Sequence, residues 1–134
     1  MNGESTNKLP AAEETVLLID DDETVAEVGK QMLKCFGYKV VSANSGNSAL
    51  EFYKENQNRI DMIILDMVLP DMDGGDAYDR LKEINPGIKV LLASGYDIDH
   101  QAKDILERGC DDFIQKPFSI SQISEKVRGI LASK

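Results

Sequence analysis

Side chains capable of acid, base or nucleophilic chemistry directly follow several of the most apolar stretches of this chain. Asp20 and Asp21 come after the first apolar run, Asp66 ends the third, Ser94 follows the fourth and Lys116 comes just after the fifth. Carboxylate oxygens are ligands for hard divalent cations, and a carboxylate can also act as a nucleophile. A lysine ammonium can neutralise a bound anion. The question is whether these residues meet in space.

The elements that must position them are five short apolar runs alternating with helical patterns. Unbroken runs of this length are typical of strands buried on both faces of a parallel sheet. Five helices are indicated by apolar residues at three- and four-residue spacing between and after the runs. The order of elements predicts an α/β fold with a doubly wound five-stranded parallel sheet, strand order 2-1-3-4-5, of the flavodoxin-like type. The expected strands are residues 16–19, 38–43, 62–66, 88–93 and 112–114.

Two of the helices carry clear local signals. The first is marked by Val25, Val28, Met32 and Phe36, which recur at helical spacing. The last begins with the sequence Ser-Ile-Ser-Gln at residues 119–122, which predicts a capping box.

Composition limits the partners and the surroundings. The chain has 134 residues with 24 acidic and 15 basic side chains, a net charge of −9. That charge argues against direct binding of nucleic acid or anionic membranes. No apolar run approaches a membrane span, there is no signal-peptide pattern, and Cys35 and Cys110 are expected to be reduced and semi-buried, so a cytoplasmic protein is expected. Residues 1–14 are predicted to be a disordered linker or tag, and residues 15–134 the single folded domain.

In the predicted strand order, the first and third strands are neighbours, so Asp20, Asp21 and Asp66 should crowd together. Like charges at short range require compensation. A Mg²⁺ ion and the ammonium of Lys116 are the two available sources, and Mg²⁺ prefers one or two carboxylates, water and substrate phosphate. The sequence therefore predicts phosphoryl transfer onto a carboxylate, aided by charge neutralisation.

The expected roles in that chemistry follow from position. Asp66 is expected to be the nucleophile, and Asp21, supported by Asp20, the metal ligand. The backbone carbonyl of Val68 is expected to complete the protein ligands. Lys116 would neutralise the negative charge of the phosphoryl oxygens, and Ser94 would hydrogen-bond the phosphoryl group.

Four segments together resemble the receiver domains of two-component response regulators. They are Leu18-Ile19-Asp20-Asp21-Asp22, residues 64–74 around Asp66, residues 92–95 around Ser94, and residues 113–118 around Lys116. The resemblance extends over about residues 15–132. It implies that Asp66 is the phosphoacceptor, Asp20 and Asp21 the acidic pair, Ser94 the switch hydroxyl, Phe113 the switch aromatic and Lys116 the motif lysine. It also implies a cis peptide between Lys116 and Pro117.

The same resemblance names partners and a response. The phosphoryl donor would be a histidine kinase or a histidine phosphotransfer domain, and the surface of the fourth helix, fifth strand and fifth helix would change on phosphorylation, which could drive dimerisation. Residues 93–96 and 109–118 look most like receivers at the C-terminus of hybrid sensor histidine kinases. Val68 and Tyr96 supply no acid or amide to orient a hydrolytic water, so slow self-dephosphorylation is expected. Whether to regard such a self-catalysed domain as an enzyme is left open.

Two other functions remain open on sequence alone. A small phosphatase could form an aspartyl-phosphate at Asp66, but the haloacid-dehalogenase type has a second acid where this chain has Val68. An interaction module could keep the fold without being phosphorylated. A calcium loop beginning at Asp71 is rejected, because its twelfth position is Lys82 where a bidentate glutamate is needed.

Overall fold

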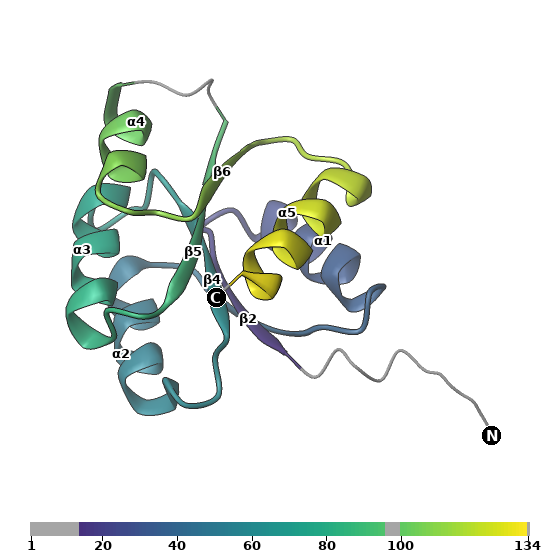
Figure 1. Ribbon diagram of the computed structural model, residues 1–134, viewed down its shortest axis with the longest axis horizontal. Coiled ribbons are helices and arrows are strands. Elements are labelled where there is room, and N and C mark those ends of the chain that lie inside the picture. The colour runs from purple at the N-terminus through teal and green to yellow at the C-terminus, as the bar shows by residue number, and fades with distance from the viewer. Residues whose placement is uncertain (1–13, 96–99, 134) are drawn as a thin grey trace.

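The structure is a computed structural model that describes residues 14–95 and 100–133. These residues form a five-stranded parallel sheet with helices on both faces (Figure 1). The strands lie in the order β3-β2-β4-β5-β6, which confirms the order predicted from the sequence. Their bounds are β2 Thr15–Ile19, β3 Lys39–Ala43, β4 Met62–Asp66, β5 Lys89–Ser94 and β6 Asp112–Gln115.

Five helices connect and follow the strands. Helices α1 and α5 cover one face of the sheet, and α2, α3 and α4 cover the other (Figure 1). None of the helices in the described parts of the chain is long and apolar enough to cross a membrane. Their bounds are α1 Glu23–Lys34, α2 Gly46–Asn56, α3 Gly74–Ile84, α4 His100–Glu107 and α5 Ile120–Ala132.

Strand β4 lies at the centre of the sheet, and all five of its residues are buried. Its side chains alternate between two cores: Ile63 and Leu65 pack on the α2–α3–α4 side, and Met62 and Ile64 pack on the α1–α5 side. This alternation follows from the two-residue repeat of a strand. Because helices cover both faces, the strand needs an unbroken apolar sequence, as predicted.

The parallel register aligns the carboxyl ends of the strands. Ile19 of β2 pairs with Leu65 of β4, so the residues that follow them, Asp20 and Asp66, emerge at the same edge of the sheet. Asp66 in turn pairs with Ala93 of β5. One edge of the sheet therefore collects the ends of three neighbouring strands.

Helix α1 packs on the sheet through smaller side chains than those by which the sequence marked this helix. Ala26, Gly29 and Leu33 are its buried residues, whereas Val28 is 48% exposed. A Cβ at position 29 would lie 3.2 Å from Leu18 Cδ2, so the helix approaches the sheet closely where glycine stands. The predicted capping box of α5 is confirmed by reciprocal bonds between Ser119 and Gln122.

The two cysteines are free thiols, as expected, but they differ in burial: Cys35 is exposed and Cys110 is buried. The linker predicted for residues 1–14 lies outside the described residues except for Glu14. Tyr96 also lies outside them.

Candidate active site

The ends of β2, β4 and β6 bring two carboxylates and one ammonium together. Lys116 Nζ lies 3.1 Å from Asp20 Oδ2 and 3.3 Å from Asp66 Oδ2. Asp20 is 4% exposed and Asp66 is 5% exposed, so both carboxylates are largely removed from water. Residues 20, 66 and 116 come from distant parts of the chain, and the predicted convergence is confirmed.

Asp21 completes a cluster that suits a hard cation. One carboxylate oxygen from each of Asp20, Asp21 and Asp66 lies within 4.8 Å of the others. Asp21 is exposed while the other two are buried, so the cluster opens to solvent on one side. An all-oxygen set that leaves room for water suits Mg²⁺, which keeps part of its hydration shell in proteins.

The charges within the cluster are not balanced by protein groups alone. Burial is the main effect that raises the pKa of Asp66; Lys116 opposes this effect, and Asp20 adds to it. Burial also lowers the pKa of Lys116, but the charges of Asp66 and Asp20 outweigh burial and leave that pKa above its ordinary value. Lys116 is therefore firmly protonated, and the site favours an additional positive charge.

The loop 67–73 after β4 is held at both of its ends. Met67 N–H donates to Ala93 O at 3.0 Å, and Gly74 N–H donates to Met67 O at 2.8 Å. Val68 pairs with Asp73 in an isolated antiparallel bridge. The Val68 side chain is 64% exposed, and its backbone N–H lies 3.5 Å from Asp66 Oδ1. The backbone N–H of Val68 therefore lies beside the Asp66 carboxylate.

Ser94 and Phe113 lie on the strands next to this cluster. Ser94 ends β5 and is buried, and its backbone carbonyl accepts a hydrogen bond from Lys116 N–H at 2.6 Å. Phe113 on β6 is half-buried and packs against the core on the α2–α3–α4 side. The peptide bond between Lys116 and Pro117 is cis, as the resemblance implied.

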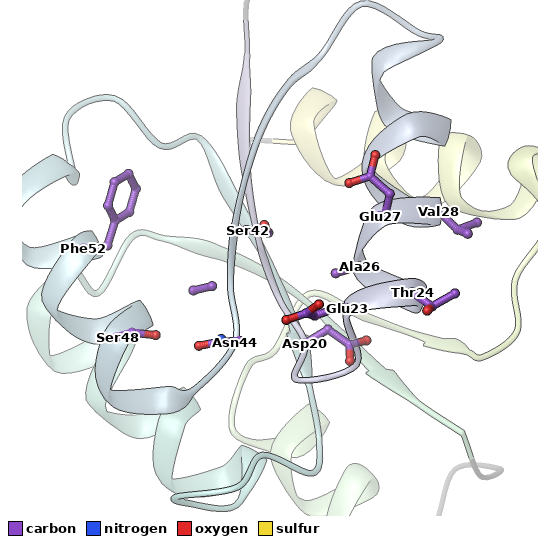
Figure 2. Close-up of a pocket in the computed structure, with 11 residues that line it drawn as sticks. Asp20, Glu23, Thr24, Ala26, Glu27, Val28, Ser42, Asn44, Ser48 and Phe52 are labelled. Atoms are coloured by element: carbon purple, nitrogen blue, oxygen red, sulfur yellow. The ribbon is translucent and has the colours of Figure 1, made fainter.

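A hollow among the described residues lies beside the cluster rather than over it. It has a volume of about 920 Å³ and extends between α1 and α2, with Glu23 and Glu27 on the α1 side and Ser48 and Phe52 on the α2 side (Figure 2). Asp20 lines it, but Asp66 and Lys116 do not. The carboxylate cluster, with its convergent charges, is the better candidate for the chemistry.

One residue near the site was missed by sequence reasoning. The sequence pattern at Asp71 suggests only a calcium loop, which is rejected, yet the Asp71 carboxylate accepts hydrogen bonds from Gly46 and Asn47 at the amino end of α2. The two segments are separated by about 25 residues in sequence. The composition of the loop does not reveal this contact.

A parallel sheet with acids at the ends of two adjacent strands and a lysine after a third defines a class of aspartate-phosphorylated signalling domain. The family model "Response regulator receiver domain" matches residues 16–128, and the chain belongs to that family. Phosphorylation on an aspartate is the general function of these receiver domains in two-component systems. The predicted family and fold are thereby confirmed.

Relatives include regulators and a kinase. The chain is 36% identical over 117 residues to the probable transcriptional regulatory protein TcrX of Mycobacterium tuberculosis, covering 87% of this chain and 49% of that protein. It is also 36% identical over 117 residues to the sensor kinase CckA of Brucella abortus, covering 87% of this chain and 12% of that protein. The chain thus spans half or less of these relatives.

A solved structure matches along nearly its whole length. A chain of the CheX-CheY-BeF3-Mg+2 complex from Borrelia burgdorferi has 26% sequence identity and a TM-score of 0.86, covering 95% of this chain and 96% of that chain. The similarity therefore extends across the whole five-stranded sheet and its helices.

Proposed function

We propose that this receiver domain accepts a phosphoryl group on Asp66 from the phosphohistidine of a histidine kinase or a histidine phosphotransfer protein. The observation that carries the proposal is the position of the Asp66 carboxylate, which lies within 3.3 Å of Lys116 Nζ and within 4.8 Å of the Asp20 and Asp21 carboxylates. The Asp66 nucleophile and the Lys116 ammonium thus lie next to the carboxylate oxygens of the acidic pair.

In the proposed transfer, an oxygen of the ionised Asp66 carboxylate attacks phosphorus. The bond between phosphorus and the donor imidazole nitrogen breaks, and its electron pair stays with the imidazole. Lys116 opposes the effect of burial on the pKa of Asp66 and so helps to keep the nucleophile charged. The same ammonium then pairs with the phosphoryl oxygens. Positioning and charge neutralisation supply most of the catalysis in phosphoryl transfer.

The residues that would hold Mg²⁺ are Asp21, Asp66 and the Val68 carbonyl, with Asp20 in support. The cation supplies neutralisation of the negative charge on the transferring group. The solved relative from Borrelia burgdorferi is named as a complex with BeF3 and Mg+2, which supports the assignment by similarity.

The proposed response begins at Ser94. Its hydroxyl would turn toward the new phosphoryl oxygens, and Phe113 would move into the space that Ser94 leaves. The surface of α4, β6 and α5 would then change, as in a two-state equilibrium that a local charge shifts. The half-buried position of Phe113 between the core and this surface supports the role.

The surroundings of the domain are part of the proposal. The similarity to a sensor kinase supports a receiver that belongs to a hybrid histidine kinase, occupying residues 15–134 of the present chain. A cytoplasmic location follows if the donor is a kinase that uses cytoplasmic ATP. Slow self-dephosphorylation is proposed from the aliphatic side chain of Val68, which is exposed beside Asp66 and cannot orient a water.

The test is incubation with acetyl phosphate and Mg²⁺, followed by intact mass spectrometry. Wild type is expected to gain one labile phosphoryl group, and Asp66→Asn is expected to gain none. An adduct that persists in Asp66→Asn would refute the assignment of the acceptor. Absence of any adduct in wild type would favour an interaction module, and turnover of a phosphate ester far beyond one equivalent would favour a phosphatase.

A further inference from the structure

A carboxylate ties the 67–73 loop to the start of α2. Asp71 Oδ1 accepts a hydrogen bond from Gly46 N–H, and Asp71 Oδ2 accepts one from Asn47 N–H, each at 2.8 Å. Gly46 and Asn47 are the first residues of α2, whose N–H groups have no acceptor within the helix. Both oxygens of one side chain therefore cap a helix that precedes it by about 25 residues.

The next residue of the loop makes a second contact with the same helix end. A Cβ at position 46 would lie 2.5 Å from both Cγ and Sδ of Met72. Glycine at the start of α2 thus allows the Met72 side chain to lie against the backbone. Asp71 and Met72 together attach the loop to α2 by a polar and an apolar contact.

Helix α2 also has a cap of its own. Ser45 Oγ accepts a hydrogen bond from Ser48 N–H at 3.1 Å, as an ordinary N-cap does. The helix therefore does not depend on Asp71 alone to satisfy its first turn. What Asp71 adds is a link between that turn and the loop that carries Val68.

The Val68 peptide depends on the loop for its position. Its own side chain is exposed, so the core holds this segment through the buried side chains of Met67 and Leu69 on either side. The bridge to Asp73 and the bond from Gly74 N–H to Met67 O close the loop on itself. Within the closed loop, Asp71 is the charged side chain that bonds to α2.

We propose that Asp71 is a positioning residue for the phosphoryl site: by holding the 67–73 loop on α2, it fixes the Val68 carbonyl where that carbonyl can bind the divalent cation. The inference rests on the proposed function, because it deepens the role of Val68 as a metal ligand. Asp71 acts at a distance and touches neither the cation nor the phosphoryl group. Residues that orient metal ligands in this way commonly affect metal affinity.

The experiment compares Mg²⁺ binding of the full chain and of Asp71→Ala by isothermal titration calorimetry. The variant is expected to bind Mg²⁺ about tenfold more weakly, at the lower end of the range for residues that orient metal ligands. Its rate of phosphorylation by acetyl phosphate should fall at low Mg²⁺ and recover at saturating Mg²⁺. Asp71→Asn keeps one acceptor oxygen and is expected to be intermediate, and it replaces Asp71→Ala if that variant does not fold.

The matched control is Ser45→Ala, which removes the other cap of the same helix end without touching the loop. Asp71→Ala and Ser45→Ala should each lower the melting temperature by roughly 3–5 °C, because each removes a helix cap. Only the Asp71 variants should weaken Mg²⁺ binding. Wild-type affinity in the Asp71 variants, or equal weakening in Ser45→Ala, would overturn the proposal. If wild type binds Mg²⁺ but accepts no phosphoryl group, the proposed function fails while the affinities still test Asp71.

Discussion

Tyr78 carries a buried hydroxyl group that has no hydrogen-bond partner among the described residues. The side chain is 2% exposed, and burial, with the nearby Cys110 and Asp111, raises its pKa to about 12. A buried polar group without a partner costs about 1–3 kcal/mol. The Tyr78 ring packs in the core on the sheet side of α3, so a test of the hydroxyl group must leave the ring in place.

Tyr78→Phe is therefore expected to increase the free energy of unfolding, by about 1 kcal/mol, because it removes the hydroxyl and keeps the ring. Urea denaturation measures the change. The matched control is Tyr53→Phe: Tyr53 is also buried, but its hydroxyl accepts a hydrogen bond from Asn85 Nδ2 at 3.0 Å, so this variant should be destabilised. Destabilisation of Tyr78→Phe would mean that the hydroxyl bonds a buried water.

The two cysteines should differ sharply in reactivity. Burial raises the pKa of Cys110 to about 11, and its thiol donates to Val90 O at 3.4 Å. Only the thiolate reacts with alkylating agents, so Cys110 remains protonated and protected from pH 7 to 9. Iodoacetamide should add one group to the native protein, on exposed Cys35, and a second only after unfolding. Peptide mapping that finds native modification of Cys110 would contradict its burial.

At the scale of the elements, the turn between β4 and α3 depends on one glycine. A Cβ at position 74 would lie 2.8 Å from Met67 Cα, a backbone atom that cannot rotate away. Gly74 N–H also bonds Met67 O at 2.8 Å, so the two segments cannot simply separate. This turn positions the peptide groups next to Asp66.

Gly74→Ala should therefore destabilise the fold by about 1–3 kcal/mol, the usual cost of overpacking. Gly129→Ala is the control, because position 129 lies in α5 with no atom within 4 Å of its added Cβ. There the change should stabilise by about 0.5–1 kcal/mol, since alanine favours helix over glycine. Thermal unfolding of both variants measures the difference; equal effects would show that the close contact at position 74 relaxes easily.

The sequence predicted the strands better than the faces of the helices. The five apolar runs identified every strand of the described sheet, because burial on both faces demands an unbroken apolar sequence. In α1, the spacing of the larger residues Val25 and Val28 predicts that they face the core, yet Ala26 and Gly29 are the residues buried against the sheet. A hydrophobicity pattern alone does not show that a helix packed close to a sheet needs small side chains.

The site itself could be predicted because strand order decides which strand ends meet. Once β2 and β4 are neighbours, Asp20 and Asp66 must lie at one edge, and Lys116 follows from the end of β6. The bond from Asp71 to α2 could not be predicted in this way. It joins the 67–73 loop to the first turn of α2, and the path of that loop depends on side-chain packing rather than on the sheet.

At the scale of the whole molecule, the carboxylate cluster is a local excess of charge in a protein that is already acidic, with a net charge of −9. Asp20 and Asp66 are buried beside the exposed Asp21, and among the described residues Lys116 is the cation that pairs with the buried two. The folded state brings these charges together and the unfolded state separates them. Their repulsion should therefore reduce stability when no divalent cation is bound.

Without divalent cations, Asp66→Asn should be more stable than wild type, by about 1 kcal/mol, a common magnitude for one substitution. Adding Mg²⁺ should raise the melting temperature of wild type, because an ion that binds only the folded state contributes about 2.7 kcal/mol at one hundred times its Kd. The rise should be smaller in Asp66→Asn and in Asp21→Asn, which each remove one ligand. Differential scanning calorimetry with Mg²⁺ or with EDTA measures all three proteins.

NaCl at matched ionic strength distinguishes binding from general screening, because screening would raise all three melting temperatures alike. Equal gains from Mg²⁺ in wild type and both variants would show that the cation does not bind at this cluster, and the roles assigned to Asp21 and Asp66 as its ligands would then be wrong.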